Sequence, residues 1–195
     1  MATKKVSYVE KSDKAAIPAL IKSLDDKNKA NRGAAIYALG SMGSEAKAAK
    51  PKLVEILQNK QESDDNRGSA AMALGEMGKD ALSAVPILVK ILENKLNPQH
   101  LGISAALALD KIDCHTLIPV LVKRLADKNF GSVSLNILSS IASKIKERQN
   151  NFSDAELTKV ISEFETAIKI INDSANEFPK AKVELLKESV AVLKG

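Results

Sequence analysis

Four prolines recur along the chain at nearly constant intervals, and each opens an apolar stretch. The stretches read IPALIKSL, KPKLVEIL, VPILVKIL and IPVLVKRL, and their prolines are Pro18, Pro51, Pro86 and Pro119. Proline is tolerated in the first turn of a helix, because the N–H that it lacks would have no intrahelical partner there. A polar turn and a second helical stretch, rich in alanine in the first three cases, follow each proline-led stretch. A helical pair repeated every 33 to 35 residues predicts a solenoid, in which a unit buries its apolar face only against its neighbours.

The second stretch in the first units is rich in small residues at helical spacing. The phrase ANRGAAIYALGSMG, residues 30–43, returns as DNRGSAAMALGEMG, residues 65–78. Small side chains on one face allow two helices to approach closely. Glycine inside a helix costs about 1 kcal/mol relative to alanine, so interior glycines here predict tight backbone contact with the neighbouring helix. The interior glycines are Gly33, Gly40, Gly68 and Gly75, while Gly43 and Gly78 are placed where a left-handed C-cap is expected.

These phrases, with the proline-led helix that follows them, resemble HEAT repeats, and specifically the short type first noticed in phycobilisome lyases. The usual pattern is an arginine, an alanine pair and Ala-Leu-Gly-x-hydrophobic-Gly. The resemblance covers residues 15–143 and is clearest in units one and two. Unit three has Gly102 in place of the arginine, with Asp110 and Asp113 in place of the glycines, and unit four keeps only the first helix. The resemblance implies an all-α, right-handed superhelix whose relatives serve as scaffolds, adaptors and, less often, enzyme subunits.

The repeats and the sequence around them predict one continuous domain. It comprises an N-terminal segment, four helical pairs and a two-helix C-terminal cap, at residues 1–13, 14–147 and 151–195. Terminal units of a solenoid need a polar outer face, which is the reason for expecting caps. Val6, Tyr8 and Val9 are expected to cover the N-terminal end.

The C-terminal segment has its own helix signals. Ser153 and Glu156 predict a capping box, and Phe152 and Leu157 predict a hydrophobic staple around it. The following residues form one apolar face at helical spacing, and a last helix is expected to begin near Pro179. We interpret this pair as a cap on the solenoid, and an amphipathic dimerisation element is the alternative.

Composition limits the classes of protein that remain. The chain of 195 residues has 45% hydrophobic residues but only 3% aromatic ones, so its core must be aliphatic. The net charge is +5 and is carried mostly by lysine, which is typical of a solvated surface rather than of bidentate phosphate recognition. A single cysteine excludes an internal disulfide. We expect a soluble, cytoplasmic protein that does not enter a membrane, although a signal peptide removed earlier would leave the same N-terminus.

One position inside the repeated phrase differs between units and is the candidate binding surface. In HEAT-like repeats this position is typically polar, because it resembles the exposed, concave side of the second helix. Here it is apolar in every unit, as Tyr37, Met72, Leu107 and Leu138. An exposed apolar ladder of this kind would bind a helix or an extended peptide. Four residues further on, a polar rim is expected at Ser41, Glu76 and Lys111. The alternative is that the ladder is buried as core.

Arg32 and Arg67 occupy one repeat position beside acidic residues. We expect each to begin a helix and bond turn carbonyls or carboxylates, and an anion or nucleic-acid contact is the alternative. The first unit is basic, and HEAT-like DNA glycosylases bind DNA on a basic concave surface. Against that function, arginine is scarce, tryptophan is absent and acidic residues occur in the later turns.

The segment DCHT, residues 113–116, is the one place where nucleophile and base residue types occur together. Adjacent side chains on a turn diverge, and His100 is expected at the opposite end of its unit, so we interpret the segment as a surface turn rather than a reactive or metal site. No phosphate-binding glycine loop or hydrolase motif is present, and we expect no catalytic residue, cofactor or metal.

The sequence therefore predicts a non-catalytic protein-interaction scaffold that binds another protein and is a monomer or weak dimer. A component of a chromophore-attachment enzyme that resembles the bilin lyases is the first alternative, with the groove holding a tetrapyrrole or the acceptor protein. Nucleic-acid binding along a basic surface is the second alternative, and it is not the expected function.

Overall fold

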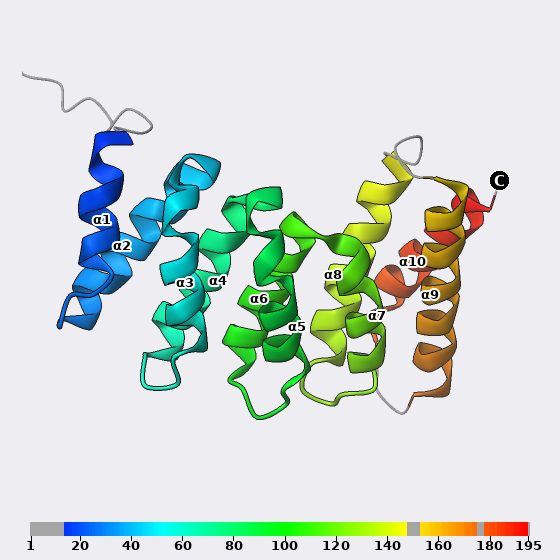
Figure 1. Cartoon of the computed structure of the whole chain (residues 1–195). Helices are drawn as coiled ribbons and strands as arrows, with labels where there is room; N and C mark the ends of the chain where they lie inside the picture. The colour runs from blue at the N-terminus through cyan, green and yellow to red at the C-terminus, as the bar shows by residue number, and fades with distance from the viewer. Residues whose placement is uncertain (1–13, 148–152, 175–177, 195) are drawn as a thin grey trace, which may run out of the picture.

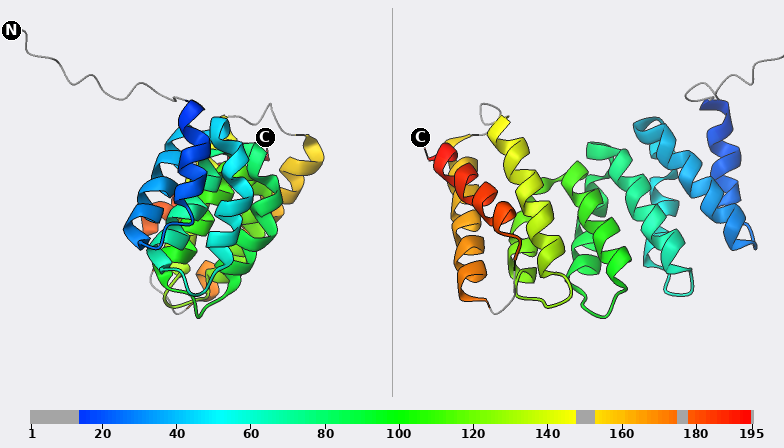
Figure 2. Two further views of the ribbon diagram at one scale, coloured as in Figure 1. Left: turned by 60° about the vertical axis from the view of Figure 1, so that its left-hand side comes forward. Right: turned by 180° about the vertical axis from the view of Figure 1, so that it is seen from behind.

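The computed structural model describes residues 14–147, 153–174 and 178–194, and within them the chain is helical without strands (Figure 1). Four helical pairs follow one another along a single axis, as the proline spacing predicts (Figures 1 and 2). The pairs are α1 (Ile17–Ser23) with α2 (Lys29–Met42), α3 (Lys50–Gln58) with α4 (Asp64–Glu76), α5 (Val85–Glu93) with α6 (Gln99–Ile112), and α7 (Cys114–Arg124) with α8 (Gly131–Glu147). The all-α solenoid is thus confirmed.

Short 3-10 helices precede the first helix of units one, two and three, a feature that the sequence pattern does not predict. They are η1 (Lys14–Ala16), η2 (Gly43–Ala49) and η3 (Gly78–Ala84). Gly43 and Gly78 begin η2 and η3 with φ of 57° and 56°, a region that glycine enters without steric cost. The predicted positive φ is confirmed, but the ψ of −131° takes Gly43 out of the left-handed helical region. These glycines turn the chain back toward the next proline-led helix.

The second helices approach each other closely, as their glycines predict. A Cβ added to Gly40 would lie 3.1 Å from Cβ of Ala73, and one added to Gly75 would lie 2.9 Å from Cα of Ala108. The backbones of α2, α4 and α6 therefore meet without intervening side chains at these points. Around them a single hydrophobic core extends from Ile17 to Val190; it is mostly aliphatic, as the composition predicts, but also contains Phe130 and Phe164.

Unit four begins differently from the others. Asp113 is the N-cap of α7, and its carboxylate accepts hydrogen bonds from the backbone N–H groups of His115 (3.1 Å) and Thr116 (3.4 Å). The expectation of a surface turn at residues 113–116 is therefore wrong, because these residues form the cap and first turn of a helix. Pro119 consequently lies inside α7 rather than in its first turn.

The C-terminal pair covers the end of the array. In α9 (Asp154–Asp173) the capping box of Ser153 and Glu156 is confirmed, and the apolar residues Val160 and Phe164 are buried. Helix α9 packs on α7, while α10 (Lys180–Leu193) packs on both α8 and α9. The apolar face of α9 is used within the chain, as a cap requires. Phe152 and the predicted N-terminal cover, Val6, Tyr8 and Val9, lie outside the described residues.

Candidate functional site

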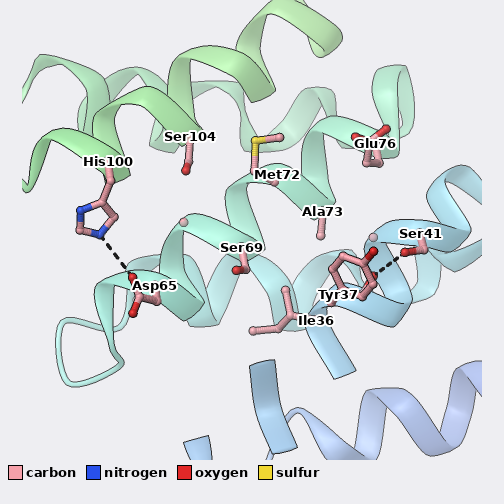
Figure 3. Close-up of a pocket in the computed structure, with 12 residues that line it drawn as sticks. Ile36, Tyr37, Ser41, Asp65, Ser69, Met72, Ala73, Glu76, His100 and Ser104 are labelled. Carbon is pink, nitrogen blue, oxygen red and sulfur yellow. Dashed lines mark hydrogen bonds and ion pairs between the residues drawn. The ribbon is translucent and has the colours of Figure 1, made fainter. Parts of the chain in front are cut away.

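The second helices of units one to three enclose a hollow of about 630 Å³ on one face of the array (Figure 3). Its floor is built from small residues of the close-packed helices, including Gly40, Gly68 and Ala73. We call this feature the hollow. It is lined by Ile36, Tyr37, Gly40, Ser41, Asp65, Gly68, Ser69, Met72, Ala73, Glu76, His100 and Ser104.

Three of the four ladder residues lie on this face of the array. Tyr37 has 77% of its surface exposed at the edge of the hollow, and Met72 lines it while being half-buried (Figure 3). Leu107 is 38% exposed on α6, beyond the residues that line the hollow. An exposed tyrosine next to a half-buried methionine provides apolar area that a partner could cover.

The ladder does not continue into unit four. Leu138 is fully buried, so the prediction that it belongs to the exposed strip is wrong. Leu138 lies on α8, on which α10 of the C-terminal cap packs directly. The next residue, Ser139, is also buried, and its hydroxyl donates to the carbonyl oxygen of Lys182 in α10 at 3.3 Å. The apolar strip therefore ends with Leu107.

The predicted polar rim is present in altered form. The Ser41 hydroxyl donates to the backbone carbonyl of Tyr37 at 3.0 Å, which holds it against its own helix. Glu76 lines the hollow and forms an ion pair with Lys111 of the next unit, although Lys111 itself is not a lining residue. The rim thus links α4 to α6 at the C-terminal ends of these helices.

Sequence reasoning missed the opposite end of the hollow. Asp65 and His100 occupy the same repeat position, seven residues before Met72 and Leu107, and His100 Nε2 lies 3.8 Å from Asp65 Oδ1. Ser69 and Ser104 line the hollow between the two ends. The repeat register could have identified all four residues, since each lies one or two turns before a ladder position on the same helix.

A family model for HEAT repeats matches residues 6–64 and 51–142 of the chain. The two matches together cover more than half of its length. The chain belongs to the HEAT-repeat family. HEAT repeats commonly act as protein-interaction scaffolds and are generally non-catalytic. No match was found among curated proteins.

The arginine of the first HEAT unit binds a carboxylate of the second. Arg32 forms a two-pronged contact with Glu62, at 2.6 Å from Nε to Oε2 and 2.9 Å from Nη2 to Oε1. Its Nη1 also donates to the carbonyl oxygens of Asp26 and Lys27. Only 4% of the Glu62 side chain is exposed. The hydrogen bonds from Arg32, and further ones from Ser63 and Asn66, lower the Glu62 pKa from 4.5 to about 2 against the opposing effect of burial.

Arg67 has the equivalent role within its own HEAT unit. Its Nε donates to the carbonyl oxygen of Leu57 at 3.2 Å, and its Nη1 contacts Asp64 at 2.6 Å. The expectation that both repeat arginines bond turn carbonyls and carboxylates is therefore confirmed.

Unit three has Gly102 instead of the arginine, and Arg124 of unit four makes the corresponding contact in its place. Arg124 donates to the carbonyl oxygen of Leu92, and Leu92 is six residues after its proline, as Leu57 is in unit two. The ring of Phe130 occupies the space above Gly102, where an added Cβ would lie 3.1 Å from Cε2. The guanidinium carbon of Arg124 lies 4.1 Å from the centre of that ring. The missing arginine is thus replaced from the neighbouring unit.

We expect Arg124→Lys to lower the free energy of unfolding by about 2 kcal/mol, because an ammonium cannot reach the Leu92 carbonyl, Asp127 and the Phe130 ring together. For a chain of this length the corresponding fall in Tm is about 4–8 °C, measurable by circular dichroism. The exposed neighbour supplies the reverse exchange, Lys123→Arg, which should change the Tm by less than about 2 °C. Equal Tm values for the two variants would contradict the proposal that Arg124 replaces the missing arginine of unit three.

The described parts of the chain contain neither a candidate metal site nor a helix that could span a membrane. The described residues contain no group of three or more His, Cys, Asp and Glu side chains that could hold a metal ion. The side chain of Cys114 lies outside the description. Among the described helices none is both long and apolar enough to cross a bilayer.

Proposed function

We propose that this HEAT array is a non-catalytic scaffold that binds a partner protein in the hollow between α2, α4 and α6. The observation that carries the proposal is Tyr37, which leaves 77% of its surface exposed at the edge of the hollow, close to Met72. Tyrosine is enriched among the residues that dominate protein–protein binding energies, because its ring buries a large apolar area while its hydroxyl stays hydrogen-bonded.

The hollow would bind a partner protein as a surface whose backbone is already fixed in the binding conformation. Its floor is fixed where the backbones of α2 and α4 meet at Gly40 and Ala73. Rigid backbone of this kind loses little conformational entropy when a partner is bound, so more of the contact energy appears as affinity. The short side chains of the floor also leave space for a partner's side chains.

The charges of the hollow favour a protein over the two alternatives. Among the described residues that line it, Asp65 and Glu76 are acidic and none is Lys or Arg. Nucleic-acid phosphates would be repelled here, whereas nucleic-acid binding depends on neutralisation by cations. The propionate carboxylates of a bilin would meet the same repulsion. Acids accompany the cations around unit one: Lys14 lies 3.8 Å from Glu45, and Asp25 forms a 2.6 Å ion pair with Lys52 of unit two.

The test compares Tyr37→Glu with Leu96→Glu. Leu96 is 94% exposed in the turn between α5 and α6, outside the hollow, and so provides a matched control. Each protein is immobilised and incubated with an extract of the source cells, and bound proteins are quantified by mass spectrometry. For a partner in the hollow, Tyr37→Glu should weaken binding about 30-fold, which corresponds to a hot-spot loss of about 2 kcal/mol. Leu96→Glu should retain it.

Equal recovery of every partner by Tyr37→Glu and by the unsubstituted chain would contradict the proposal, provided that helicity and Tm are unchanged. Loss of the same partners with Leu96→Glu would also contradict it, because a charge outside the hollow should not affect binding inside it.

A further inference from the structure

The hollow carries a charge opposite to that of the whole chain. The chain has a net charge of +5, but the charged groups lining the hollow are the carboxylates of Asp65 and Glu76, with His100 beside the first. The Asp65 side chain is 94% exposed and touches His100 only at 3.8 Å, which leaves its oxygens available as acceptors. Glu76 is 44% exposed and shares its charge with Lys111. An anionic site on a cationic protein indicates the charge of its ligand.

The two carboxylates lie at opposite ends of the same helix. Asp65 is in the first turn of α4 and Glu76, eleven positions later, is its last residue, so the two positions are about 16 Å apart along the helix axis. Met72 lies between them, with Tyr37 of α2 on one side and Ser104 of α6 on the other (Figure 3). An acidic side chain therefore lies at each end of the hollow, and the hydroxyl and apolar side chains lie between them.

We propose that the partner presents a basic segment with an apolar centre: one apolar side chain enters the hollow beside Met72 and Tyr37, and Lys or Arg side chains on both sides of it bind Asp65 and Glu76. This inference rests on the proposed function and specifies the chemistry of the partner. A guanidinium can bind the exposed Asp65 carboxylate through two parallel hydrogen bonds. The 16 Å spacing corresponds to about three helical turns or about five extended residues of the partner.

Other occupants fit the hollow less well. An acidic segment would place like charges within the same few ångströms, which destabilises an interface. Within the part of the chain that the structure describes, Leu96 is the most exposed large apolar side chain, and it is flanked by Lys95 on one side only, so it does not supply a basic, apolar-centred segment from a second copy. Both occupants are outcomes that the experiment separates.

The experiment selects twelve-residue peptides from a random phage-displayed library on the immobilised full chain. Enriched peptides are synthesised with a fluorophore, and their Kd values are measured by fluorescence polarisation. We expect them to carry Lys or Arg on both sides of an apolar residue. Asp65→Asn and Glu76→Gln should each weaken binding about fivefold, the upper range for a partly exposed ion pair. Glu93→Gln, an exposed acid on α5, is the matched control and should leave the Kd unchanged.

The two proposals fail in different ways. Enriched peptides that are acidic or uncharged, or that bind Asp65→Asn and Glu76→Gln as tightly as the unsubstituted chain, would overturn the basic-partner inference. If such peptides still lost affinity with Tyr37→Glu, the hollow would remain a peptide site and the proposed function would stand. Peptides unaffected by Tyr37→Glu would overturn both proposals, and enrichment of no peptide above background would overturn the inference.

Discussion

Replacing Glu62 by alanine is expected to lower the free energy of unfolding by about 3 kcal/mol. The Glu62 carboxylate accepts hydrogen bonds from Arg32, from the Asn66 side chain at 3.0 Å and from the Ser63 backbone at 2.9 Å. Removing the acceptor leaves these donors unsatisfied in a site where the carboxylate is almost fully buried. Urea denaturation followed by circular dichroism measures the effect.

Glu62 also makes the free energy of unfolding depend on pH. Because its pKa is lowered on folding, stability decreases as the pH falls. The Glu62 pKa falls from 4.5 to about 2 on folding, so the unfolded chain binds the proton more tightly than the folded chain. Its stabilising contribution is therefore complete above about pH 4.5 and is lost as the pH falls toward 2.

Glu62→Gln supplies the control for the pH effect, because it keeps the size of the side chain and one acceptor oxygen but cannot titrate. Its free energy of unfolding should be lower than that of the unsubstituted chain at pH 6, and the difference should shrink as the pH falls toward 2. A difference that stayed constant from pH 6 to pH 2 would contradict the assigned role of the carboxylate.

A second large effect is expected at Gly75, where an alanine should lower the free energy of unfolding by about 2 kcal/mol. The added Cβ would lie 2.9 Å from Cα of Ala108, so the backbones of α4 and α6 would have to separate. This cost exceeds the gain of up to about 1 kcal/mol that alanine has over glycine in a helix. Chemical denaturation and thermal unfolding both measure this loss of stability.

The same helix contains the matched control. An alanine at Gly68 would meet only the Ser104 hydroxyl, at 3.1 Å, and this side chain can rotate away. Gly68→Ala should therefore change the free energy of unfolding by less than about 1 kcal/mol. If Gly75→Ala were as stable as Gly68→Ala, close backbone contact between α4 and α6 would not be a determinant of stability.

The periodic features of the sequence predicted the repeats well. Pro18, Pro51 and Pro86 begin their helices because a proline-led first turn is a local property that needs no knowledge of the neighbours. The interior glycines predicted close helix contact for a similar reason, since their cost inside a helix must be offset by packing. Elements whose cause is local could be predicted from the sequence.

Features that depend on another unit could not be predicted in this way. Arg124 reaches Leu92 in the preceding unit, and no pattern within either unit signals that bond. The start of α7 at Cys114 follows from Asp113 acting as a cap, although the repeat pattern only marks it as a replaced glycine. These departures occur where the repeat is least regular.

The candidate site shows the same division. The repeat register identified Tyr37, Met72 and Leu107, because equivalent positions of stacked second helices face the same side. It could not identify the burial of Leu138, which lies on α8 where the repeat ends and the C-terminal α10 packs. Asp65 and His100 share a register position too, but their pairing across units appears only when α4 and α6 are placed side by side.

Because Arg124 of unit four replaces the missing arginine of unit three, the contact between units three and four depends on acid differently from the contact between units one and two. Units one and two are joined through the buried Glu62 carboxylate, which gains a proton at low pH. Between units three and four, Arg124 binds the backbone carbonyl of Leu92, which has no proton to gain, and a carboxylate takes part only in the second contact, the ion pair of Asp110 with Lys144. Because a solenoid is stabilised by the sum of its nearest-neighbour contacts, loss of one contact weakens a single junction. Acid should therefore weaken the junction of units one and two first, while the bond from Arg124 to the Leu92 carbonyl still links units three and four.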